Sequence, residues 1–128
     1  MRQKHIIVFG KPHGIVSIPE VGAVVFLNPM ERTLLRLFVA HPEGLAASGL
    51  LEHWQELCCL YEQESRFDDK PLRDNALESL CAESRMVFYG NVSRIKKKFV
   101  DVLGARKASA YYIKRGKDGV YKTLAAPG

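Results

Sequence analysis

The chain has 128 residues, of which 47% are hydrophobic and 26% charged, and its formal net charge is +5. This composition supports one packed domain over residues 1–128 and excludes wholesale disorder. No apolar run approaches the roughly 20 residues of a membrane span. Three cysteines, an odd number, argue against a disulfide framework. We therefore expect a soluble, cytoplasmic protein with no membrane partner.

The first 27 residues are predicted to form strands. β-Branched and aromatic runs bounded by glycine and proline are typical of hairpins. Three such runs occur, at residues 6–9, 15–18 and 23–27. They predict a small N-terminal antiparallel sheet, and an α+β fold once the helices that follow are included.

A helical core is predicted for residues 28–103, and its first helix has the clearest start signal. Asn28 suits the N-cap, Pro29 the first helical position, and Glu31 the reciprocal position of a capping box. The helix should end in the segment 41–44, because this segment contains both proline and glycine.

A second helix is predicted for residues 48–62, which carry an apolar stripe at helical spacing. The residues of this stripe are Leu50, Leu51, Trp54, Leu57, Cys58 and Tyr61. The glutamates expected to face solvent are Glu52, Glu56 and Glu64. Residues 63–74 are polar and include Pro71, so we expect a loop there, followed by a short helix at 76–81. Residues 62–85 are interpreted as an insertion in the helical core.

The third predicted helix, residues 86–103, is amphipathic and basic. Its apolar stripe consists of Phe88, Val92, Ile95, Phe99 and Val102. Two predicted strands follow, at residues 110–114 and 120–124, and the charged loop 115–119 joins them. The segment 108–125 is therefore a predicted β-hairpin.

The charge is distributed unevenly along the chain. Residues 1–84 contain 8 lysines and arginines and 12 acids, a net charge of −4. Residues 85–128 contain 11 lysines and arginines and two acids, a net charge of +9. A basic helix fits the major groove of a duplex, and a basic hairpin can reach its phosphates or the minor groove. A solvated basic face without a partner is the alternative interpretation of these charges.

Two segments of the basic region carry a more specific pattern. Residues 92–99 read Val-Ser-Arg-Ile-Lys-Lys-Lys-Phe, and residues 113–116 and 119–124 read Ile-Lys-Arg-Gly and Gly-Val-Tyr-Lys-Thr-Leu. They resemble the recognition helix and wing of OmpR/PhoB-type response regulators. The resemblance implies a winged helix-turn-helix fold with three main helices, and a transcription regulator that binds double-stranded DNA. It leaves open a homodimer on DNA and a separate signalling protein as further partners.

The resemblance also assigns roles to individual residues. The groove-facing candidates are Asn91, Arg94 and Lys97, and Ser93 belongs to the same segment. The candidates for contacts with phosphates or the minor groove are Lys96, Lys98, Arg115 and Lys117.

Other functions are competing hypotheses. A protein-interaction module that keeps the winged-helix fold without binding DNA would fit the acidic first 84 residues and the insertion. RNA binding would fit the aromatic residues interleaved with lysine in the last hairpin. No nucleophile–base pattern or phosphate loop occurs, so no enzyme is predicted. No metal or cofactor is predicted either, because the four histidines lack the spacing of metal ligands: they are His5, His13, His41 and His53.

Overall fold

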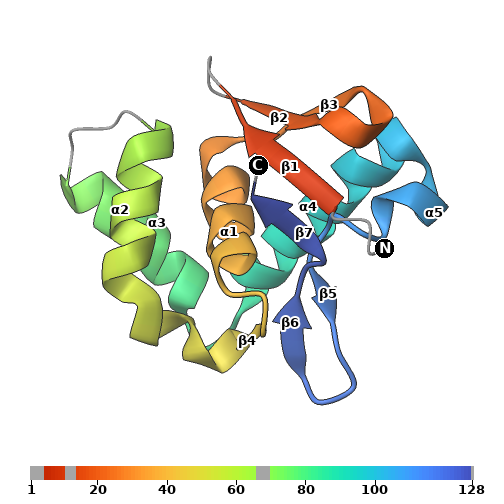
Figure 1. Cartoon of the computed structure of the whole chain (residues 1–128). Coiled ribbons are helices and arrows are strands. Elements are labelled where there is room, and N and C mark those ends of the chain that lie inside the picture. The colour runs from red at the N-terminus through yellow and green to blue at the C-terminus, as the bar shows by residue number, and fades with distance from the viewer. Residues whose placement is uncertain (1–4, 11–13, 66–69, 128) are drawn as a thin grey trace.

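The computed structural model describes residues 5–10, 14–65 and 70–127. Over these residues the chain has an α+β fold with five α-helices, a four-stranded sheet and a three-stranded sheet (Figure 1). The predicted α+β class is therefore confirmed. No helix in this described part is both long enough and apolar enough to cross a bilayer.

The larger sheet has three strands in the predicted places and a fourth from the other end of the chain. Strands β1 (His5–Phe9), β2 (Ile15–Ile18) and β3 (Ala23–Phe26) are antiparallel neighbours. Strand β7 (Ala125–Pro127) pairs with β1 in parallel, so the strand order is β3-β2-β1-β7. The sheet is therefore mixed, and the prediction of an antiparallel sheet holds only for its first three strands.

One face of this sheet covers the helices. Ile7, Val16 and Val25 alternate with more exposed residues along their strands and are buried in the core. Strand β3 packs against α4 (Met86–Leu103), and β7 packs against α1 (Pro29–Ala40). The sheet thus holds these two helices in a fixed relation to each other.

Helix α1 begins at the predicted capping box. The Glu31 N–H donates a 2.8 Å hydrogen bond to the Asn28 side chain, and the Asn28 N–H donates one of 2.9 Å to the Glu31 carboxylate. Two N–H groups that lack partners within the helix are satisfied in this way. The helix ends at Ala40, next to the predicted stop. Strand β4 (Leu45–Ala46), which was not predicted, follows and pairs with the C-terminal hairpin.

The second helical segment differs from its prediction. Its first part is a 3₁₀ helix, η2 (Ala47–His53), and the regular helix α2 (Trp54–Ser65) follows. A 3₁₀ helix has three residues per turn, so the stripe expected from the α-helical period does not persist through it. Leu51 is therefore exposed, although it was predicted to lie in the core. Trp54 and Cys58 pack against the core as expected.

Helix α3 (Lys70–Cys81) occupies much of the segment that was predicted to be a loop. Residues 66–69 of that predicted loop lie outside the described part of the chain. Pro71 falls in the first turn of α3, where its missing N–H has no helical partner to lose. Leu77 and Leu80 are fully buried on the same side of the helix and anchor it. The described core therefore has four long helices where three were predicted.

Helix α4 has the predicted bounds and is entered through a short turn. Residues 82–85 connect α3 to α4, and Arg85 has a φ of 55°, in the left-handed region that few residues other than glycine adopt. The fully buried residues of the predicted stripe are Phe88, Ile95 and Phe99. Val102, in the last turn, is exposed and does not belong to the core. The short helix α5 (Ala105–Ala108) follows.

The C-terminal hairpin is shorter than predicted. Strands β5 (Lys114–Arg115) and β6 (Val120–Lys122) pair antiparallel, and β6 also pairs with β4. Residues 110–113 were predicted to be strand, but they are not part of either sheet. Tyr111 and Ile113 are buried there and belong to the core. Figure 1 shows the hairpin projecting beyond β7 and α4.

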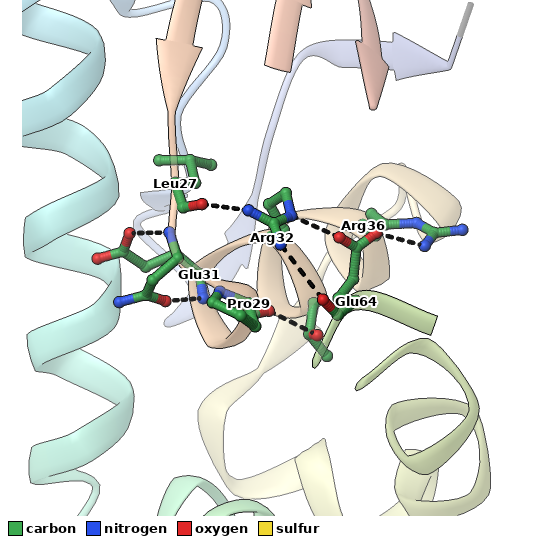
Figure 2. A network of polar contacts seen from close by, with 8 residues as sticks. Leu27, Pro29, Glu31, Arg32, Arg36 and Glu64 are labelled. Atoms are coloured by element: carbon green, nitrogen blue, oxygen red, sulfur yellow. Dashed lines mark hydrogen bonds and ion pairs between the residues drawn. The ribbon is translucent and has the colours of Figure 1, made fainter. Parts of the chain in front are cut away.

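A buried ion network joins α1 to α2 (Figure 2). Arg32 is 2% exposed, and its guanidinium donates hydrogen bonds to the Glu64 carboxylate and the Leu27 carbonyl. Arg36 Nη1 lies 2.8 Å from Glu64 Oε1. The prediction that Glu64 faces solvent is therefore wrong: it is 8% exposed and neutralises two arginines. Charges are tolerated at such burial because they are paired.

Candidate nucleic-acid interface

The outer face of α4 carries several of the residues predicted to bind DNA. Ser93, Arg94, Lys96 and Lys97 are all exposed. At 100° per residue, Gly90, Ser93 and Lys97 form the central row of this face, with Arg94 and Lys96 on opposite sides of it. The centre of the face therefore combines the cation of Lys97 with small side chains and, one turn after Lys97, with the exposed carboxylate of Asp101.

Asn91 does not belong to this face. It is 2% exposed, and its Nδ2 donates a 2.8 Å hydrogen bond to the Val87 carbonyl one turn earlier. Asn91 stands three residues after Phe88 and four before Ile95, so the helical period places it among the buried side chains. Its Oδ1 is buried without a hydrogen-bond partner among the described residues. The prediction that Asn91 faces a groove is therefore wrong.

Arg94 and Lys98 are held by a carboxylate of α1. Arg94 Nε lies 3.2 Å from Glu31 Oε2, Lys98 Nζ lies 2.5 Å from Glu31 Oε1, and Glu31 is fully buried. Arg94 is still 54% exposed, and its guanidinium lies over Gly90, where an added Cβ would be 3.2 Å from Nη1. Glu31 thus fixes α4 to the start of α1 and compensates part of the charge of both cations.

A tyrosine between two lysines connects α4 with β5. The Lys96 and Lys114 ammonium groups lie 5.6 and 5.8 Å from the centroid of the Tyr112 ring. Both distances are within the range of cation–π attraction. Lys114 was not predicted as a site residue, because the sequence around a single lysine in a strand does not indicate which residues will lie next to it in the fold. Together the three side chains make the basic surface continuous from the helix to the hairpin.

Two cations of the hairpin are Arg115, which ends β5, and Lys117, in the loop that follows it. The Gly116 N–H donates a 2.7 Å hydrogen bond to the Val120 carbonyl, and the Gly119 N–H donates one of 3.1 Å to the Gly116 carbonyl. Gly119 has a φ of 80°, a conformation that other residues adopt only with strain. Because the turn is closed by its own backbone, both cations are left exposed.

Aromatic packing fixes the hairpin against the N-terminal half of α4. The Phe88 and Tyr121 rings meet edge to face, with centroids 5.0 Å apart and an angle of 89°. The Tyr89 ring lies 6.4 Å from that of Tyr121. Burial raises the pKa of the Tyr121 phenol, and the nearby Tyr89 raises it further, whereas Arg115 lowers it. Helix and hairpin therefore present their cations as one surface.

Away from this surface, the structure brings together three residues that are distant in the sequence. His41 follows α1, His53 ends η2, and Glu56 lies in the first turn of α2. Their nitrogen and oxygen atoms lie within 4.8 Å of one another, an arrangement that could hold a metal ion. The hydrogen bond to Glu56 raises the pKa of His41. The prediction of no metal site rested on spacing along the sequence, which this arrangement does not follow.

No family model, curated protein or solved structure matches the chain. On α4 and the hairpin, five exposed cations make no ion pair with any described residue: Lys96, Lys97, Arg115, Lys117 and Lys122. Their charge is available to an anion outside the protein.

Proposed function

We propose that the chain is a winged helix-turn-helix domain that binds double-stranded DNA and regulates transcription. The observation that carries this proposal is the set of exposed, unpaired cations that α4 shares with the hairpin. Lysine and arginine side chains that neutralise phosphates release counterions, and this release supplies most of the sequence-independent affinity for DNA. A rigid surface with cations on two elements suits a duplex better than a small anion.

The arrangement of the elements supports the same proposal. Residues 82–85 connect α3 to α4 by a turn of the length found in helix-turn-helix motifs, in which the second helix enters the major groove. That groove is about 12 Å wide and admits one helix. Strands β4, β6 and β5 form a small sheet, and its β6 packs against α4 through Phe88 and Tyr121. This packing supports the interpretation of the hairpin as a wing.

Individual side chains have different roles in this proposal. Lys97 and Ser93 face the groove from the centre of α4, and Lys96 reaches phosphates from its side. Arg115 and Lys117 contact the backbone or the minor groove from the hairpin. The two cations paired with Glu31 contribute less, because their charge is partly compensated inside the protein.

The proposal is tested by titrating a fluorescent random-sequence duplex with the protein at several salt concentrations. If about six basic side chains neutralise phosphates, the logarithm of the affinity should fall with the logarithm of the salt concentration with a slope of about −5. Single-stranded RNA of the same length serves as competitor. Binding that does not respond to salt, or stronger competition by RNA than by duplex DNA, would contradict the proposal.

Protein binding is a second candidate function, favoured by the apolar end of α4. Met86 is 76% exposed, and Val87 and Tyr89 are also exposed. Apolar side chains at the start of this helix fit an apolar protein surface better than a phosphate backbone. A protein partner that survives nuclease treatment, and that is lost in a Met86→Ser/Tyr89→Ser variant, would favour this function if the chain does not bind the duplex.

A further inference from the structure

Three side chains with metal-binding atoms meet where α1 ends and α2 begins. His41 Nε2 lies 2.8 Å from Glu56 Oε1, and His53 Nδ1 lies 3.5 Å from the same oxygen. The His41 and His53 rings are in contact, with centroids 4.6 Å apart. We propose that His41, His53 and Glu56 form a binding site for Zn²⁺ or a closely similar divalent transition-metal ion.

The distances suit an ion of this size. Zinc binds imidazole nitrogen and carboxylate oxygen at about 2.0–2.2 Å, so two of its ligands in a tetrahedron stand about 3.4 Å apart. The His53–Glu56 pair already has this separation, and all three ligand atoms lie within 4.8 Å of one another. Each of the three side chains is partly exposed, so the ion can enter and the side chains can rotate to close around it.

The donor atoms select the class of metal. Two imidazoles and one carboxylate are the protein ligands of three-ligand zinc sites, which keep a fourth position for water or another group. Magnesium and calcium prefer oxygen ligands throughout and would gain little from two histidines. The mixed nitrogen and oxygen set therefore favours Zn²⁺ over both.

A fourth side chain orients one of the ligands. Glu43 Oε1 lies 3.2 Å from His41 Nδ1, on the side of the ring away from Glu56. A metal-binding histidine commonly donates its other N–H to a carboxylate, which fixes the ring and its tautomer. Without an ion, His41 Nε2–H donates to Glu56. An ion would displace this proton, and Nδ1–H donating to Glu43 would then leave the Nε2 lone pair directed at the ion.

The backbone around His41 is also fixed. The His41 N–H donates a hydrogen bond of 3.2 Å to the Phe38 carbonyl, and its carbonyl accepts one of 2.9 Å from Gly44. An ion held here links the end of α1 to the start of α2. The site includes no residue of α4 or the hairpin, so its occupancy can be tested separately from DNA binding.

The experiment uses the full chain, stripped with a chelator and kept reduced. Calorimetric titration with Zn²⁺ should show one ion per chain, and Co²⁺ should give the visible absorption of a tetrahedral site without sulfur-to-cobalt charge transfer. His53→Gln and Glu56→Gln should each weaken Zn²⁺ binding by more than the roughly 10- to 100-fold typical of second-shell changes, and Glu43→Ala should weaken it by about 10-fold. Zn²⁺ should raise the melting temperature of the wild type but not of His53→Gln.

His5→Gln is the matched control, because His5 Nδ1 lies 3.2 Å from Glu20 in a histidine–carboxylate pair outside the proposed site. This variant should bind Zn²⁺ as the wild type does. Circular dichroism checks that every variant is folded. Absence of saturable binding, binding that persists in His53→Gln, or a thiolate charge-transfer band that assigns the ion to the cysteines would each overturn the proposal.

Discussion

The charged side chains at the start of α1 and those on the outer face of α4 are held in opposite ways. Glu31 and Arg32 are buried, and each is paired with a partner from another helix. Lys97 on α4 and Lys117 on the hairpin are exposed and have no ion-pair partner among the described residues. A buried charge must be paired for the chain to fold, whereas an exposed cation contributes little to stability. Folding therefore accounts for the buried charges Glu31 and Arg32, but it gives no role to the exposed cations Lys97 and Lys117.

The largest expected effect is a loss of stability when a buried ion pair is broken. Glu64→Ala leaves Arg32 buried without its carboxylate, and we expect the free energy of unfolding to fall by about 3–5 kcal/mol. Glu62→Ala is the matched control on the same helix, because Glu62 is 53% exposed and its partner Arg73 keeps a second ion pair with Asp74. Its loss should be at most about 1 kcal/mol. Urea denaturation measures both values.

If Glu64→Ala and Glu62→Ala lower the free energy of unfolding equally, the buried network does not hold α1 against α2. The double substitution Arg32→Met/Glu64→Leu sharpens the test. It should recover most of the stability that Glu64→Ala loses, because neither charge is then buried without its partner. A double variant as unstable as Glu64→Ala would indicate that packing, and not charge pairing, dominates at this site.

A smaller effect should separate two cations of the same helix. Arg94→Ala removes one partner of the buried Glu31, and we expect it to lower the free energy of unfolding by about 1 kcal/mol. Lys97→Ala removes an unpaired cation and should change this free energy by less than about 0.5 kcal/mol, while reducing the slope of DNA affinity on salt by about 1. If Lys97→Ala is the more destabilising of the two, the distinction between paired and free cations on α4 is wrong.

Local signals made two of the helices predictable. The start of α1 depends on Asn28 and Glu31, which are three residues apart and contact each other directly. Helix α4 depends on an apolar stripe of which Phe88, Ile95 and Phe99 are fully buried. In both cases the residues that decide the structure are neighbours along the chain, so their pattern is visible in the sequence.

The features that the sequence did not predict depend on distant partners. Glu64 is buried because Arg32 and Arg36 stand opposite it on another helix, and nothing near Glu64 in the sequence indicates this. The start of helix α3 was predicted to be a loop because the segment is polar and contains a proline, which the first turn of a helix tolerates. The cluster of His41 and His53 exists only because α1 and α2 pack together.

The most direct test of the central claim compares two double variants that lose the same charge. Lys96→Ala/Lys97→Ala removes the unpaired cations of α4, and Arg106→Ala/Lys107→Ala removes two exposed cations of α5. For a random-sequence duplex, the first variant should weaken binding about tenfold or more and make the slope of log affinity against log salt concentration shallower by about 2. The second variant should change both quantities much less. Equal losses from the two variants would mean that DNA affinity follows net charge alone, and would contradict α4 as the contact surface.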